Sequence, residues 1–254
     1  MHNIKLNELL SCGGSLKMRV RHIYFVLISI IIFTLIGCDV LTKKETNDEV
    51  HIDFTEKNIE VYETEAYETG FNIGKEAKKI VNNSEFEKPA IRVNKQFINM
   101  DKIEYARINA KYTKYDDIRE NILTVIKMEV LRQEAVRLGV EPIPNEVDEE
   151  VMRIEQGLRE RQNPFLNGYL DGMDMSVEEY LLEVKETTYL TKQRGKLLEM
   201  VMKDFKDKIT KEAERRKIPY SEVEKKYYDK YTANLIKKAQ IEYVDPNVKQ
   251  LMGY

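Results

Sequence analysis

Residues 122–140 read ILTVIKMEVLRQEAVRLGV, and this stretch decides the fold class. Its apolar side chains recur at steps of three and four residues, which places them on one broad face of a helix; they are Leu123, Ile126, Val130, Leu131, Ala135 and Leu138. Gly139 follows at the position where a left-handed residue commonly ends a helix. The stretch therefore predicts a long amphipathic helix in a mainly α-helical domain.

Two further helices are predicted on the C-terminal side of this one. Pro144-Asn145 indicates a helix start with Asn145 as the N-cap, and acidic residues follow in the first turn. Residues 176–179, SVEE, form a capping box that opens a long helix through Phe205. Between the two starts, residues 163–173 (NPFLNGYLDGM) contain Gly and Asn and predict a break in the helical pattern.

The later part of the chain adds one more helix start and one exposed face. Residues 221–224, SEVE, form a second predicted capping box, with Ser221 as the N-cap. Within the long helix that begins at the first capping box, Thr187, Thr188 and Thr191 lie among charged residues, which predicts a solvated surface.

A small β element is predicted at the two ends of the domain. Residues 90–93 (AIRV) and 94–98 (NKQFI) are typical of a strand, a turn and a second strand. Residues 241–244 (IEYV) have the β-branched and aromatic content of a short strand. We expect this last strand to pair with residues 90–93 and so to bring the ends of the domain together.

The N-terminal part of the chain carries an ordered set of export signals. Residues 18–38 read MRVRHIYFVLISIIIFTLIGC, in which two arginines precede an uncharged apolar run. The run is shorter than the about 20 residues of a membrane-spanning helix, and this order is typical of a signal peptide. The ending Leu35, Ile36, Gly37 and Cys38 resembles the bacterial lipobox, which implies that Cys38 is acylated and becomes the mature N-terminus.

The lipobox resemblance predicts the location and the domain bounds. We expect residues 1–37 to be a lipoprotein signal peptide, with Met18 as a candidate start, and residues 38–85 to be the lipidated cysteine and a polar tether. Residues 86–254 would form the folded domain. A lipid on Cys38 would hold the mature chain on the extracytoplasmic side of a cell membrane. The alternative is an uncleaved signal anchor.

Composition argues against several classes of function. The 41 basic and 44 acidic side chains nearly balance, whereas nucleic-acid binding needs a clustered basic excess. Both cysteines, Cys12 and Cys38, precede the folded region, and His51 lies in the predicted tether. The sequence contains no phosphate loop, nucleophile elbow or metal-ligand motif. We therefore expect no catalytic residues, cofactor, metal or small-molecule substrate.

Three motifs recur in order along the predicted helices: Gln133-Glu134-Ala135 with Gly139-Val140, Glu146-Val147-Asp148, and residues 175–180 (MSVEEY). Together they resemble the N-terminal chaperone domain of the SurA/PrsA-type foldases, over roughly residues 88–205. In that family a parvulin-type peptidyl-prolyl isomerase domain is inserted before the chaperone domain is completed. Here residues 221–228 resemble the entry to that insertion and residues 235–246 the return, with only a few residues between them.

The resemblance implies a chaperone that lacks the isomerase domain. Its expected partners are unfolded or newly exported polypeptides, held on flexible apolar side chains; the candidates are Met128, Met152, Phe165, Tyr169, Met173, Met175 and Tyr180. The structural alternative is that these side chains form the core. The functional alternatives are a dedicated interaction module of the cell envelope and, third, an active peptidyl-prolyl isomerase.

Overall fold

The computed structural model describes residues 56–113 and 117–254, and most of them are helical, as the sequence predicts. In chain order the elements are α3 (Glu56–Val81), the 3-10 helix η1 (Ser84–Glu87), β1 (Pro89–Val93), β2 (Gln96–Asn99), α4 (Met100–Tyr112), α5 (Ile118–Arg137), α6 (Pro144–Arg159), α7 (Pro164–Met173), α8 (Val177–Arg216), α9 (Tyr220–Lys238), β3 (Ile241–Tyr243) and α10 (Pro246–Leu251).

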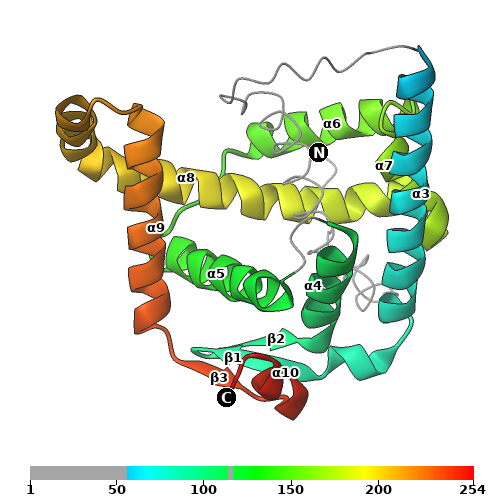
Figure 1. Ribbon diagram of the computed structural model, residues 1–254, viewed down its shortest axis with the longest axis horizontal. Coiled ribbons are helices and arrows are strands. Elements are labelled where there is room, and N and C mark those ends of the chain that lie inside the picture. Colours follow the sequence, from blue (N-terminus) through cyan, green and yellow to red (C-terminus); the bar gives the residue numbers. More distant parts are fainter. Residues whose placement is uncertain (1–55, 114–116) are drawn as a thin grey trace, which may run out of the picture.

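The 40-residue helix α8 crosses the molecule, with α6 on one side, α5 on the other and α9 against its far half (Figure 1). Its start confirms the first predicted capping box. The Ser176 hydroxyl accepts a hydrogen bond from the Glu179 backbone N–H, and the Glu179 carboxylate accepts one from the Ser176 backbone N–H. These reciprocal bonds satisfy backbone donors that a helix start leaves without intrahelical partners.

The predicted strands form one antiparallel sheet with the order β2-β1-β3. Ile91 pairs with Ile98 across the hairpin and with Tyr243 on the other side, which confirms the pairing of residues 90–93 with the C-terminal strand. Asn94 turns the hairpin with a φ of 55°, a left-handed conformation that asparagine tolerates better than most residues. The sheet lies at one end of the molecule beside α10 (Figure 1).

Helix α5 forms where residues 122–140 predict it, but its buried face is rotated from the predicted one. The buried apolar side chains are Ile122, Val125, Ile126, Val130, Leu131 and Ala135. Leu123 and Leu138, which the spacing placed on the core side, are exposed. Gly139 has a φ of 64° directly after the helix, which confirms its predicted capping role.

The predicted tether of residues 38–85 requires a correction. Residues 56–81 form the helix α3, which packs against α7 and, more lightly, against α4. Its side chains in the core are Ile73, Ala77 and Ile80. Among the residues that the structure describes, the folded domain therefore begins with α3 rather than at residue 86.

The segment 163–173 does not break the helical pattern, because Asn163 caps the short helix α7 and residues 164–173 form it. Gly70 and Gly74 on α3 face Gly168 and Gly172 on α7, and the partner backbone fills the space that a Cβ atom would occupy at each glycine. The glycines thus allow two helices to approach closely. The sequence pattern was misleading because backbone contact here replaces the large apolar side chains that normally mark a buried face.

Two predicted N-caps are also wrong. Helix α6 begins at Pro144 with Ile143 as its N-cap, and α9 begins at Tyr220 after Pro219. Pro144 suits the first helical position of α6 because the fixed φ of proline matches the helix and its missing N–H has no intrahelical partner there, whereas Pro219 is the N-cap of α9. The helix start at Pro144 places Asn145 inside the first turn, and the start at Tyr220 does the same for Ser221.

Candidate functional site

A cleft of about 630 Å³ opens between the hairpin and the helices α5 and α8. The β2 strand and its turn form one wall, α5 a second and α8 a third, and the start of α4 closes one end. The residues that line it are Lys95, Gln96, Phe97, Ile98, Asn99, Asp101, Lys102, Val125, Met128, Glu129, Arg132, Ala135, Glu186, Leu190, Thr191, Gln193 and Arg194. Its size is within the range of small-ligand and peptide side-chain pockets.

The strand wall is an edge of the sheet. Within the described chain β2 pairs with β1 alone, so its second edge has no neighbouring strand. An edge strand presents backbone N–H and C=O groups that can pair with another extended chain. Along β2, Ile98 is buried while Phe97 is 54% exposed, so a large apolar side chain stands next to these polar groups.

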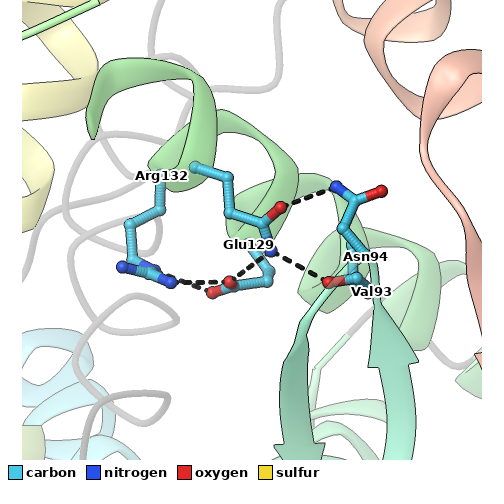
Figure 2. A network of polar contacts seen from close by, with 5 residues as sticks. Val93, Asn94, Glu129 and Arg132 are labelled. Carbon is cyan, nitrogen blue, oxygen red and sulfur yellow. Dashed lines mark hydrogen bonds and ion pairs between the residues drawn. The ribbon is translucent and has the colours of Figure 1, made fainter. Parts of the chain in front are cut away.

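The α5 wall is fixed to the hairpin by a polar network (Figure 2). Arg132 donates two hydrogen bonds to the Glu129 carboxylate, at 2.8 and 2.7 Å. Gln133 donates to Glu129 at 2.7 Å and to the carbonyl oxygen of Val93 at 3.1 Å, and it accepts from the Asn94 side chain at 2.7 Å. Because these bonds join two walls of the cleft, they hold its shape.

The α8 wall carries a cation in an unusual position. The side chain of Arg194 is partly buried, and burial lowers the pKa of its guanidinium. Its hydrogen bond goes to the sulfur of Met128. One turn earlier Leu190 adds an apolar surface, and the neighbouring Gln193 is held in place by donating to the carbonyl oxygen of Val140 at 2.9 Å.

Buried polar groups gather beyond the α4 end of the cleft. Asp101 and Lys102 form an ion pair at 3.5 Å; burial lowers the pKa of Lys102, and the Asp101 charge opposes that shift. Burial raises the pKa of Glu183 to about 8, with Lys102 acting in the opposite direction. Among residues 56–113 and 117–254, one carboxylate oxygen of Glu183 and the hydroxyls of Tyr105 and Tyr169 are buried without a hydrogen-bond partner.

The predicted solvated face of α8 is wrong for two of its three threonines. Thr187 and Thr188 are buried because helices pack against more than one side of α8, and within the described part of the chain neither hydroxyl has a hydrogen-bond partner. Thr191 is partly exposed and lines the cleft. A long helix in the middle of a fold has more than one buried face. The charged residues next to these threonines in the sequence therefore predicted the wrong environment for them.

The structure separates the predicted client-binding residues into four groups. Met128 lines the cleft, and Met152 is 58% exposed on α6, away from it. Phe165 and Met175 are partly buried against a core cluster. The remaining residues are core side chains, which corrects the prediction that they contact clients; they are Tyr169, Met173 and Tyr180.

Sequence reasoning missed the main cleft residues. Phe97 could have been found, because it follows a predicted turn and alternates with the apolar Ile98 in a strand that was expected at the end of a small sheet. Arg194 and Leu190 carried no such signal. They become neighbours of Met128 only when α8 packs against α5.

The lipobox residues Leu35, Ile36, Gly37 and Cys38 lie outside the described residues, as does the whole segment that joins them to α3. In the described ranges no helix combines the length and apolar character needed to cross a bilayer, and no three potential ligands cluster around a metal-sized site. Comparisons with protein-family models, curated proteins and solved structures found no match to the chain. The foldase resemblance therefore stays a prediction that depends on the motifs alone.

Proposed function

We propose that this chain is a lipid-anchored extracytoplasmic lipoprotein that holds unfolded, newly exported polypeptides as a chaperone, without isomerising prolyl bonds. The observation that supports it is the open edge of β2, with the exposed Phe97 beside it, in the wall of the cleft. An acylated Cys38 would keep the domain at the membrane surface where exported chains emerge.

The mechanism follows from the chemistry of the walls. An extended client can add to β2 through main-chain hydrogen bonds, which every sequence can form apart from its prolines. Met128 and Leu190 then offer apolar contact, and the thioether of methionine repacks against side chains of different shape. Binding of this kind is broad and reversible, as holding many different clients requires.

The fixed framework around the cleft supports this mechanism. Gln133 ties the hairpin to α5, and Gln193 ties α8 to the segment after α5, so both contacts are made by side chains on the walls themselves. A preformed edge loses little conformational entropy when a client binds. The client and the side chain of Met128 then adapt to each other, whereas the strand β2 keeps its conformation.

Suppression of client aggregation tests the proposal. The soluble fragment 39–254 should suppress aggregation of several unrelated unfolded proteins, and Phe97→Ser should remove most of that suppression. Leu182→Ser is the matched control, because Leu182 is similarly exposed, at 58%, but does not line the cleft. No suppression by the unmodified fragment, at several-fold excess over each client, would reject the chaperone function.

Two further measurements address the alternatives. Crosslinking in envelope extract should capture a broad set of polypeptides; a single stoichiometric partner would instead indicate a dedicated interaction module. A proline-isomerisation assay on short peptides should show no acceleration by the fragment. Measurable acceleration would reject the part of the proposal that excludes isomerase activity.

A further inference from the structure

We propose that the cleft selects client segments that present a carboxylate near an apolar side chain, and that Arg194 is the residue that recognises the carboxylate. This inference depends on the proposed function, because it assumes that an extended polypeptide occupies the cleft. It adds a chemical preference to that site.

The first step is the state of the Arg194 side chain. Arg194 lines the cleft and is partly buried, burial lowers the pKa of its guanidinium, and its hydrogen bond is to the sulfur of Met128, a weak acceptor. Within the described ranges no carboxylate oxygen lies within ion-pair distance of it. An arginine keeps its charge even when buried, so this cation is partly desolvated without a counter-ion.

The other cations of the cleft differ from Arg194 in this respect. Arg132 is held in a two-bond pair with Glu129, and Lys102 is paired with Asp101. Lys95 is exposed at the hairpin turn, where water solvates it. Among these groups an anion would therefore stabilise Arg194 the most. A planar carboxylate can accept two parallel hydrogen bonds from its guanidinium.

The second step is the spacing of the apolar surface. Leu190 lies one turn before Arg194 on the same side of α8, and side chains with this spacing are about 5–6 Å apart on a helix. In an extended chain, alternate side chains point the same way and are about 6.6 Å apart. A client strand on the β2 edge can thus place a carboxylate at Arg194 and an apolar side chain two residues away at Leu190.

Either an acidic side chain or a C-terminal carboxyl group supplies this chemistry. The test uses four labelled peptides in binding titrations with the mature lipoprotein in detergent. Two share an apolar-x-Asp or apolar-x-Asn core with amidated ends. The other two have a neutral core that ends in a free carboxylate or in an amide.

We expect at least one carboxylate peptide to bind about 10- to 100-fold more tightly than its neutral counterpart, the range for a hydrogen-bonded buried charge. The pair that shows the difference identifies the source of the carboxylate. Arg194→Met should reduce this preference to about twofold or less. Lys203→Gln, which removes one exposed positive charge from the same helix, should keep it.

Thermal unfolding separates recognition from a structural role. Because a desolvated cation without a counter-ion destabilises the fold, Arg194→Met should unfold at the same temperature as the parent protein or higher. If Arg194→Met unfolds at a lower temperature than the parent protein, Arg194→Lys provides a second test of recognition. It should retain folding and lose several-fold of the preference, since lysine lacks the two-bond geometry.

The outcomes distinguish this inference from the proposed function. Equal affinity for the carboxylate and neutral peptides of both pairs would overturn the role of Arg194 and leave the chaperone function intact. A preference that survives in Arg194→Met would overturn it as well. Absence of binding by all four peptides would reject both proposals.

Discussion

The backbone of Gly70 on α3 lies directly against the backbone of Phe165 on α7, where a Cβ built on Gly70 would be 2.0 Å from the Phe165 carbonyl oxygen. The same arrangement recurs one turn later between Gly74 and Tyr169, and in the reverse direction between Gly168 and Tyr67. The two helices thus run parallel in backbone contact. This contact makes α3 part of the domain rather than part of a linker.

Substitution of these glycines should separate the two helices. We expect Gly70→Ala and Gly168→Ala each to lower the free energy of unfolding by about 1–3 kcal/mol or more, the usual effect of overpacking against an unyielding neighbour. Gly195→Ala on α8 is the control, because nothing lies within 4 Å of the added methyl group. It should stabilise by about 0.5–1 kcal/mol through helix propensity. Equal effects at all three positions in urea unfolding would contradict the close contact.

Removal of α3 should expose the core beneath it. A fragment of residues 82–254 lacks Ile73, Ala77 and Ile80, which pack in the cluster that contains Tyr169 and Met173. We expect it to unfold at a lower temperature than residues 56–254 and to bind a hydrophobic dye. If both fragments unfolded at the same temperature and neither bound the dye, residues 56–81 would be only a tether, as the sequence predicted.

The buried carboxyl group of Glu183 should make stability depend on pH. Its pKa in the folded protein is about 8, above its ordinary value of 4.5, because burial disfavours the charged form. The folded state therefore binds more protons than the unfolded state between these values. The resulting stability is complete below about pH 4.5 and is lost as the pH rises through about 8.

Glu183→Gln provides the measurement of this effect. The variant cannot ionise, so its free energy of unfolding should change less between pH 5 and pH 8.5 than that of the parent protein. At pH 8.5 we expect it to be the more stable of the two by roughly 1–3 kcal/mol. Glu178→Gln is the control, because Glu178 is an exposed first-turn residue of the same helix. Parallel pH profiles for the parent and Glu183→Gln would refute the prediction.

The turn residue Asn94 should contribute through both its backbone and its side chain. Its φ of 55° is unfavourable for alanine, and its side chain bonds to Gln133 and to the backbone N–H of Gln240. We expect Asn94→Ala to cost about 2–3 kcal/mol of stability. Asn94→Gly, which removes only the side-chain bonds, should cost about 1 kcal/mol less. Chemical unfolding of the three proteins measures the difference, and equal losses would assign the whole effect to the side chain.

Local signals were sufficient where a short segment determines its own structure. The repeat of apolar residues and the left-handed Gly139 specified α5, and the reciprocal Ser176–Glu179 bonds specified the start of α8. The alternation of side chains and the turn residues specified the hairpin, and the composition of residues 241–244 specified the third strand of the sheet. Most of these features depend on interactions between residues that are close in sequence. The exception is the C-terminal strand, which forms by pairing with residues 90–93.

Tertiary structure alone decided the rest. The packing of α3 on α7 is made by glycine backbones, which have no apolar side chain to announce a buried face, and the burial of Thr187 and Thr188 depends on which helices surround α8. Arg194 contacts Met128, and both line the same cleft as β2, because α5 and α8 pack together. Sequence periodicity predicts which face of one helix is buried. A cleft is formed by several elements, and their relative positions cannot be predicted from the sequence of any one of them.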